Sequence, residues 1–81
     1  MSPTIEARVD AVLDLIRAEV GRAMLKHPAV TNSRHHHFAV LKEEVDELWD
    51  EVKRDGIPEG QKEAIQVGAM AVRFILETPS A

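Results

Sequence analysis

Six acidic side chains fall within nine consecutive positions of the chain, in a stretch with helical spacing. They are Glu43, Glu44, Asp46, Glu47, Asp50 and Glu51. Residues three and four positions apart project to the same side of a helix, so Glu43, Glu44 and Glu47 can share one hard cation through carboxylate oxygens. Without a cation, like charges at this spacing repel one another. The segment is therefore a candidate metal site, and a solvated acidic face is the alternative interpretation.

The apolar residues of the same segment occupy a separate face of the predicted helix. This stripe consists of Leu41, Val45, Leu48 and Val52, with Trp49 at its edge. Glu44 lies at the rim of the stripe, where the next helix would partly bury its carboxylate, and a cation or hydrogen bond must offset the desolvation. Magnesium sites take a few protein carboxylates and leave other positions to water and phosphate oxygens. Glu63, on the next predicted helix, is the further acid that would complete such a site.

The overall composition limits the chemistry that is open to the chain. With 10 basic and 14 acidic side chains the net charge is −4, which argues against a nucleic-acid partner because nucleic-acid binders usually carry a basic face. The absence of cysteine leaves carboxylates, histidines, lysines and arginines as the reactive groups. The sequence has no apolar stretch of membrane-spanning length and no signal peptide at its N-terminus. We therefore expect a soluble, cytoplasmic protein without a membrane partner.

Helical spacing of apolar residues predicts an all-α chain with a single domain over residues 1–81. The expected helices cover about residues 4–27, 34–55 and 61–77. Ser2 or Thr4 can cap the first helix, with Pro3 in its first turn. Gly21 is interpreted as a place of close packing within this helix. Pro28 prevents the helix from continuing, because the residue before a proline is pushed out of helical geometry.

The two connections between the predicted helices contain residues that start and stop helices. Asn32 or Ser33 can cap the second helix. Asp55 and Gly56 are expected to end it, with the glycine in the left-handed conformation. Residues 57–60 then form a short turn before the third helix.

The third predicted helix is apolar over more than half of its circumference, which requires more than one neighbour. Its small residues Gly68, Ala69 and Ala71 allow another backbone to approach closely. We therefore predict that this helix pairs antiparallel with the second helix on one side and with a second subunit on the other, giving a helical bundle that is a homodimer or a homotetramer. Trp49 and Phe38 are expected to pack in the core or at an interface.

One pattern in the chain is similar to a known family signature. Leu41-x-Glu43-Glu44-x-x-Glu47-Leu48, followed on the next helix by Glu63, resembles the LxEExxEL and later ExxD signature of the MazG-like all-α nucleoside triphosphate pyrophosphohydrolases. The flanking sequence is similar to the short phage and bacterial members of this group. The resemblance covers about residues 32–76 of the chain.

This resemblance implies a reaction and a set of metal ligands. Water attacks a nucleoside triphosphate in the presence of Mg²⁺, or of Mn²⁺ as an alternative ion, and releases pyrophosphate and a (deoxy)nucleoside monophosphate. Carried over position by position, the metal carboxylates would be Glu43, Glu44, Glu47 and Glu63. One acid would act through a water as general base, and Glu44 and Glu47 are the catalytic candidates.

The resemblance also points to residues that could bind the substrate. His35 matches the family's position, and an imidazole there can donate a hydrogen bond to phosphate. His36 and His37 cannot face the same ion as His35, because consecutive helical residues lie about 100° apart, and we interpret them as surface residues. Lys53 and Arg73 can contact phosphate, while solvent-facing and ion-paired roles remain open for both.

The main departure from the family pattern is Gln66, which stands where the ExxD signature has an aspartate. Glutamine offers a neutral carbonyl oxygen to a cation but cannot accept a proton as a base. Three interpretations follow: a weaker metal site that includes Gln66, a Gln66 that hydrogen-bonds the base or ribose, or a catalytically silent helical oligomer that binds nucleotide or a protein partner. The sequence leaves the base and the sugar of the substrate undetermined.

Overall fold

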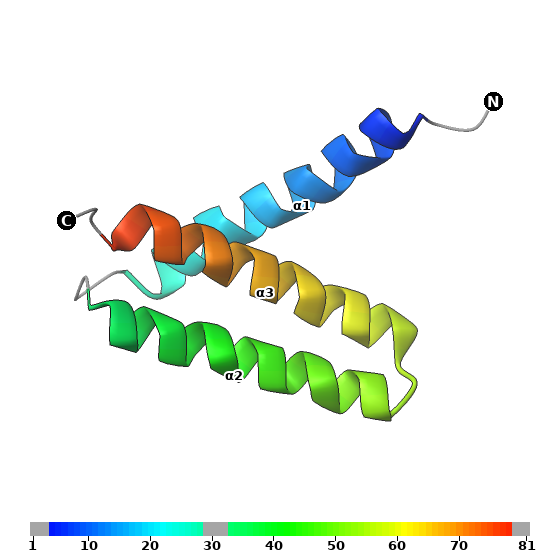
Figure 1. Ribbon diagram of the computed structural model, residues 1–81. Coiled ribbons are helices and arrows are strands. Elements are labelled where there is room, and N and C mark those ends of the chain that lie inside the picture. The colour runs from blue at the N-terminus through cyan, green and yellow to red at the C-terminus, as the bar shows by residue number, and fades with distance from the viewer. Residues whose placement is uncertain (1–3, 29–32, 79–81) are drawn as a thin grey trace.

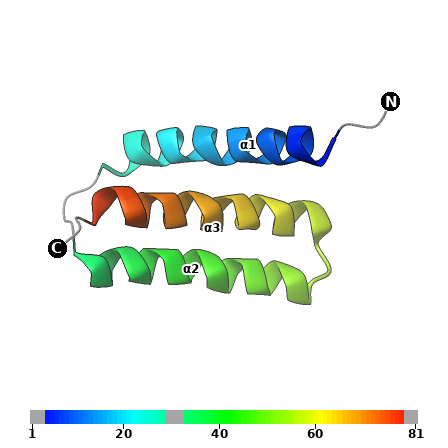
Figure 2. The ribbon, with the colours of Figure 1, turned by 45° about the horizontal axis from the view of Figure 1, so that its top comes forward.

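The computed structural model describes residues 4–28 and 33–78, which form three α-helices. They are α1 (Ile5–Lys26), α2 (Arg34–Lys53) and α3 (Ile57–Glu77). The predicted all-α class is confirmed, and so is the antiparallel pairing of α2 with α3 (Figure 1). In Figure 2, α3 lies between the other two helices. Both α1 and α2 contact α3, whereas no Cα atoms of α1 and α2 lie within 8 Å of each other.

The first two helices begin at side-chain caps that the sequence predicted. The Thr4 hydroxyl accepts a hydrogen bond of 3.1 Å from the Ala7 amide at the start of α1. The Ser33 hydroxyl accepts one of 3.4 Å from the His36 amide at the start of α2. These bonds satisfy amides that have no partner within their own helix. The alternative caps Ser2 and Asn32, together with Pro3, lie outside the described residues.

The connection between α2 and α3 differs from the prediction. The left-handed residue is Asp55, with φ of 57°, whereas Gly56 has φ of −79° and caps α3. Helix α3 begins at Ile57 rather than at residue 61, because Pro58 has the backbone angle of a first helical turn and needs no amide partner there. The predicted turn at residues 57–60 is therefore wrong. As a result, Glu63 is the seventh residue of α3, well inside the helix.

The buried apolar core of the described chain is small. It consists of Ala23 on α1 and of Ala69 and Met70 on α3, with Val20, Val40 and Leu41 packed against it. Gly68 permits the approach of α1, since a Cβ atom at this position would lie 3.0 Å from Cδ1 of Ile16. The prediction that small residues on α3 allow close packing is confirmed for this pair of helices. Gly21 does not mark close packing within this chain, because a Cβ atom there would meet open space.

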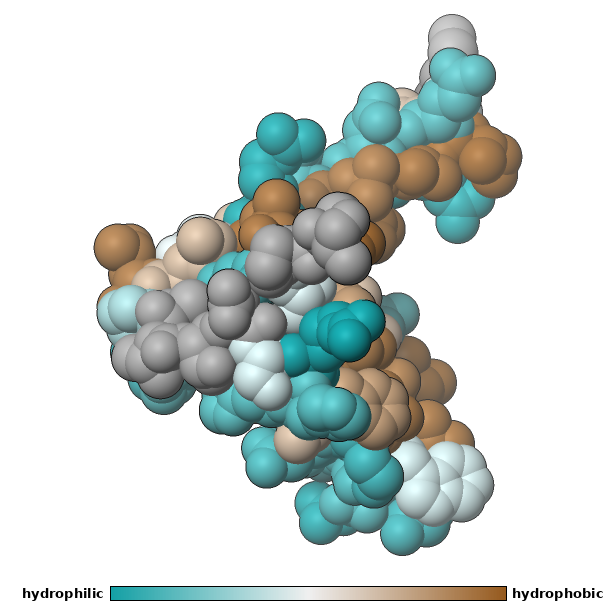
Figure 3. Space-filling view, turned by 60° about the vertical axis from the view of Figure 1, so that its left-hand side comes forward, coloured by the Kyte–Doolittle hydropathy of each residue, from teal (hydrophilic) through white to brown (hydrophobic). Residues whose placement is uncertain are grey.

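Many large apolar side chains remain exposed on all three helices. Figure 3 shows a band of hydrophobic residues along α1 and further apolar side chains on the lower part of the molecule. Ile5 is 69% exposed, Ile75 is 75% exposed, and Trp49 and Phe38 are each 58% exposed. Trp49 and Phe38 therefore do not pack in the core of this chain. None of the helices in the described part of the chain is long and apolar enough to cross a membrane.

Candidate metal centre

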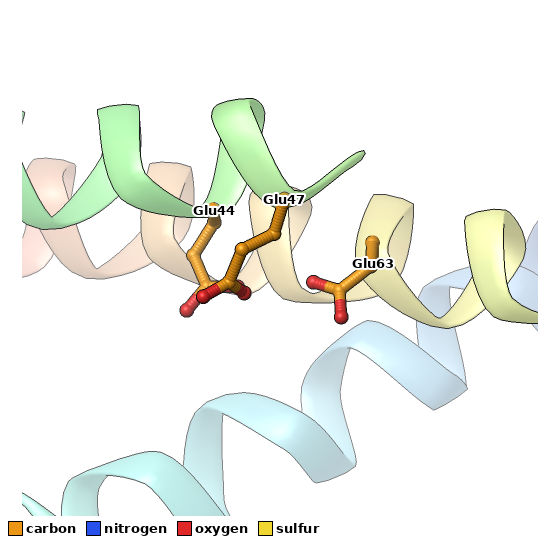
Figure 4. A group of neighbouring side chains, drawn as sticks. All are labelled: Glu44, Glu47 and Glu63. Carbon is orange, nitrogen blue, oxygen red and sulfur yellow. The ribbon is translucent and has the colours of Figure 1, made fainter. Parts of the chain in front are cut away.

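Three glutamates from two helices bring their carboxylates together. Glu44 and Glu47 are one turn apart on α2, and Glu63 faces them from α3 (Figure 4). One carboxylate oxygen of each residue lies within 4.8 Å of one from each of the others. Glu44 and Glu63 are partly buried between the helices, while Glu47 is exposed. We refer to Glu44, Glu47 and Glu63 as the glutamate group.

The environment of the glutamate group opposes negative charge. Burial, together with the nearby Glu47 and Glu63 carboxylates, raises the pKa of Glu44 from 4.5 to about 7, and burial is the largest of these causes. Burial and the Glu47 charge also raise the pKa of Glu63. The Oε2 atom of Glu63 is buried and has no hydrogen-bond partner among the described residues. Three carboxylates are thus held together, and none of them forms an ion pair with a basic side chain in residues 4–28 and 33–78.

This set of donors fits a hard divalent cation. Oxygen atoms of carboxylates are the ligands that Mg²⁺, Mn²⁺ and Ca²⁺ take in proteins. A cation shared by Glu44, Glu47 and Glu63 would remove their mutual repulsion and give the buried Oε2 atom of Glu63 a partner. The group can therefore hold a metal ion, and its residue types alone do not select one hard cation over another.

Glu43, the fourth carboxylate of the predicted metal set, lies outside the glutamate group. It is exposed, and its role as a ligand stays a prediction. The remaining acids of the segment pair with basic residues on their own helix. The pairs are Asp46 with Lys42 at 3.0 Å, Asp50 with Lys53 at 3.3 Å and Glu51 with Arg54 at 3.6 Å. These pairs agree with the interpretation that part of the acidic segment is solvated surface.

A pocket of about 580 Å³ lies beside the glutamate group. Glu43, Glu44 and Gln66 line it from α2 and α3. Glu44 thus belongs both to the glutamate group and to the pocket wall. Gln66, at the position where the similar family signature has an aspartate, lines the same pocket as Glu44. The lining residues from α1 and from the start of α2 were not predicted as site residues: Glu19, Arg22, Ala23, Lys26, His27, Pro28, His36 and His37.

The three consecutive histidines are placed differently from the prediction. His35 is exposed and does not line the pocket, whereas His36 and His37 do. His37 is buried rather than on the surface, and its Nδ1 atom lies 3.5 Å from Oε2 of Glu77. His35 was selected by its position in the family signature, whereas the 100° rotation between neighbours only excludes one ion shared by all three histidines. The position of the pocket decides which histidines line it, and this position depends on how α1 packs, because α1 forms one of the pocket walls.

The two basic residues proposed for phosphate binding are engaged in ion pairs. The Arg73 guanidinium is buried and donates to Glu77 at 2.9 to 3.1 Å. It also donates to the backbone carbonyls of His27 at 2.8 Å and of Ala23 at 3.4 Å. Lys53 pairs with Asp50, and its Nζ atom lies 5.8 Å from the centroid of the Trp49 ring. The ion-paired interpretation holds for both residues, although Arg73 also lines the pocket.

Comparisons of the chain with protein-family models, with curated proteins and with solved structures found no match. The family resemblance therefore rests on the sequence pattern around the glutamates. What the structure establishes is a small all-α protein of three helices with a cluster of acidic residues that can hold a metal ion.

Proposed function

We propose that the protein is a Mg²⁺-dependent nucleoside triphosphate pyrophosphohydrolase, with Mn²⁺ as an alternative ion. The convergence of Glu44, Glu47 and Glu63 is the observation that carries this proposal. These three residues are also positions of the signature that resembles the MazG-like family. Two independent considerations, the sequence pattern and the electrostatic need for a cation, thus favour the same residues.

The products of the proposed reaction are pyrophosphate and a (deoxy)nucleoside monophosphate. The oxygen of water bonds to the α- or β-phosphorus, and the bond from that phosphorus to the bridging oxygen breaks, which separates pyrophosphate from the monophosphate. One proton of the water passes to a base and the other is lost to the solvent. Glu44 or Glu47 accepts the first proton as general base, because both belong to the glutamate group and Glu44 also lines the pocket that the substrate and its water would share. A bound divalent cation supplies positive charge that offsets the negative charge of the phosphates. Glu63 contributes an oxygen from the opposite helix.

The pocket beside the glutamate group is the proposed nucleotide site. Its volume of about 580 Å³ is within the range of roughly 300 to 1,000 Å³ that small-molecule sites occupy. Gln66 can hydrogen-bond the base or the ribose through both its carbonyl and its amide group. Glu43 at the pocket edge is the fourth carboxylate for the metal. His35 and Lys53 contact substrate in this proposal only if the nucleotide extends beyond the pocket.

An assay for pyrophosphate with a panel of ribo- and deoxynucleoside triphosphates tests the proposal. Wild-type protein should release pyrophosphate from at least one nucleotide with Mg²⁺ or Mn²⁺ and should lose this activity in EDTA. Glu44→Gln, Glu47→Gln and Glu63→Gln should each lower the rate by about 100-fold or more. Glu6→Gln, on the exposed start of α1, is the matched control and should leave the rate unchanged. Absence of pyrophosphate across the whole panel would contradict the proposal.

A catalytically silent nucleotide-binding protein is the second candidate, and Gln66 is the observation that favours it. Replacement of an aspartate by glutamine removes one negative charge from the wall that faces Glu44. If the wild type is silent for this reason, Gln66→Asp should produce Mg²⁺-dependent pyrophosphate release. If the wild type is active, the same substitution changes the preferred nucleotide or metal without creating the activity.

We also propose that a second copy of this chain covers part of the exposed apolar surface. The chain exposes 6427 Å², which is about 1,500 Å² more than the roughly 4,900 Å² expected for a folded protein of 9.0 kDa. A standard interface buries about 800 Å² from each partner, so the excess is enough for one or two such interfaces. A second copy of the same chain can cover this apolar surface without any other protein, and the assembly would be a homodimer or a homotetramer.

Measurement of the molar mass by light scattering during size-exclusion chromatography tests the proposed assembly. Wild-type protein should have the mass of two or four chains. Ile75→Asp should lower this mass, because Ile75 is 75% exposed in the single chain and a charge there would be buried in an interface. Arg17→Gln, at an exposed position of α1, is the control. A mass of one chain for the wild type would contradict the proposal.

A further inference from the structure

One wall of the pocket comes from the C-terminal half of α1, and its residues have no role in the proposed reaction. Glu19, Arg22, Ala23 and Lys26 line the pocket, and their spacing of three and four places them on one face of α1. His27 and Pro28 continue this wall beyond the end of the helix. The wall therefore faces Glu43 and Glu44, which lie on α2.

The two walls carry opposite charge. Arg22 and Lys26 project from α1, whereas Glu43 and Glu44 project from α2. The Glu19 carboxylate, with a side chain only 8% exposed, pairs with the Arg22 guanidinium, which is 72% exposed. A guanidinium has five N–H donors, so this pair orients Arg22 and leaves donors for a ligand. No ion pair of Lys26 occurs among the residues that the structure describes.

The basic wall is fixed to the rest of the fold by a buried ion-pair network. The Arg73 guanidinium on α3 donates to the carbonyls of His27 and Ala23, at the end of α1. Glu77 accepts from Arg73 on the same side, and His37 on α2 lies 3.5 Å from Glu77. The side chains of Arg73, Glu77 and His37 are each about 9% exposed. All three helices are thus joined at this end of the pocket. The network therefore holds in place the segment of α1 that carries Arg22 and Lys26.

We infer that Arg22 and Lys26 form an anion-binding wall that contacts the phosphate groups of a nucleotide held in the pocket. This inference rests on the proposed function and names residues that the sequence pattern did not indicate. A triphosphate carries several negative charges, and the wall with Glu43 and Glu44 repels it unless a cation is bound there. Basic side chains on the opposite wall neutralise the phosphates that the cation does not reach, and arginine can bind two phosphate oxygens at once.

Titration calorimetry with inorganic triphosphate in the presence of Mg²⁺ tests the inference, because this probe has the phosphates without a base or sugar. Arg22→Gln and Lys26→Gln should each weaken binding by about tenfold, and the double variant should weaken it further. Arg17→Gln is the matched control, since Arg17 is an exposed arginine of the same helix that does not line the pocket. Its affinity should equal that of the wild type. Higher salt should weaken the wild type more than the double variant.

The outcomes separate this inference from the proposed function. Equal triphosphate affinity of the double variant and the wild type overturns the inference, and so does a wild type that does not bind triphosphate. Pyrophosphate release by the wild type from the nucleotide panel is measured independently, so either idea can fail alone. Circular dichroism of the variants checks folding. Because Arg22→Gln leaves the buried Glu19 carboxylate without its ion-pair partner, Lys26→Gln, at an exposed position, tests the wall independently of that pair.

Discussion

A carboxylate oxygen of Glu44 on α2 lies within 4.8 Å of one of Glu63 on α3, and burial raises the pKa of both residues. Neither residue can approach the other in an unfolded chain except by chance. The repulsion between them is therefore created by the pairing of α2 with α3. Folding stability, protonation and cation binding are therefore linked through this one contact.

Without divalent cations, the protein should lose stability as the pH rises from about 4.5 to above 7. The pKa of Glu44 is about 7 in the folded chain, against 4.5 for an ordinary glutamate, so the folded state retains a proton that the unfolded state has lost. The contribution is fully present below pH 4.5 and disappears as the pH rises through 7. Thermal unfolding in EDTA across this range measures it. Glu44→Gln should flatten the pH dependence, and an unchanged profile would contradict the assignment.

Mg²⁺ should stabilise the folded protein, and the effect should grow with pH up to about 8. Cation binding needs ionised carboxylates, and Glu44 must release its proton first. At a concentration of 100 times the dissociation constant, a ligand adds about 2.7 kcal/mol to the free energy of unfolding. Melting temperatures with and without Mg²⁺ provide the measurement. Glu63→Gln should reduce the stabilisation strongly, whereas Asp10→Asn on α1 should not.

Arg73→Met should lower the free energy of unfolding by about 3 to 5 kcal/mol, because the buried Glu77 carboxylate loses its guanidinium partner and keeps only His37 beside it. The carbonyls of His27 and Ala23 lose their donors as well. Arg54→Met is the control, since Arg54 is 74% exposed and its ion pair with Glu51 contributes at most about 1 kcal/mol. Urea unfolding of both variants gives the comparison. Equal losses would show that the Arg73 network does not hold α1.

Gly21→Ala should stabilise the protein by about 0.5 to 1 kcal/mol, because alanine is the better helix former and its methyl group meets open space. Gly68→Ala has the same gain in helix propensity, but its Cβ atom must displace the Ile16 side chain from a distance of 3.0 Å. The second variant should therefore be the less stable of the two. Chemical denaturation of both proteins measures the difference, and the reverse order would mean that Gly21 packs against a second copy.

Local signals in the sequence were sufficient to predict the helices and part of the glutamate group. Apolar spacing and the caps Thr4 and Ser33 predicted where α1 and α2 begin. Positions three apart on one helix brought Glu44 and Glu47 together, and antiparallel pairing brought Glu63 opposite them. These features depend on residues that are close in sequence or on adjacent helices.

The predictions that the structure corrected concern segments whose residues are compatible with two different local structures. Pro58 is compatible with a turn and with a first helical turn, and the structure adopts the second, which lengthens α3. Adjacent glutamates point about 100° apart, so the orientation of α2 toward α3 places Glu44, but not Glu43, in the group. The pocket wall of Arg22 and Lys26 depends on how α1 packs, which is a relationship between distant parts of the chain.

The position of α3 between α1 and α2 has a consequence for the range of ligands. The two pocket walls come mainly from α1 and α2, whose Cα atoms stay more than 8 Å apart, so α3 and the Arg73 network set the width of the opening. Under the proposed function, this spacing would limit the size of the nucleotide that the pocket accepts. Hydrogen bonds to groups such as Gln66 would then discriminate between bases of similar size, and loss of those bonds would broaden the choice of nucleotide before it abolishes binding.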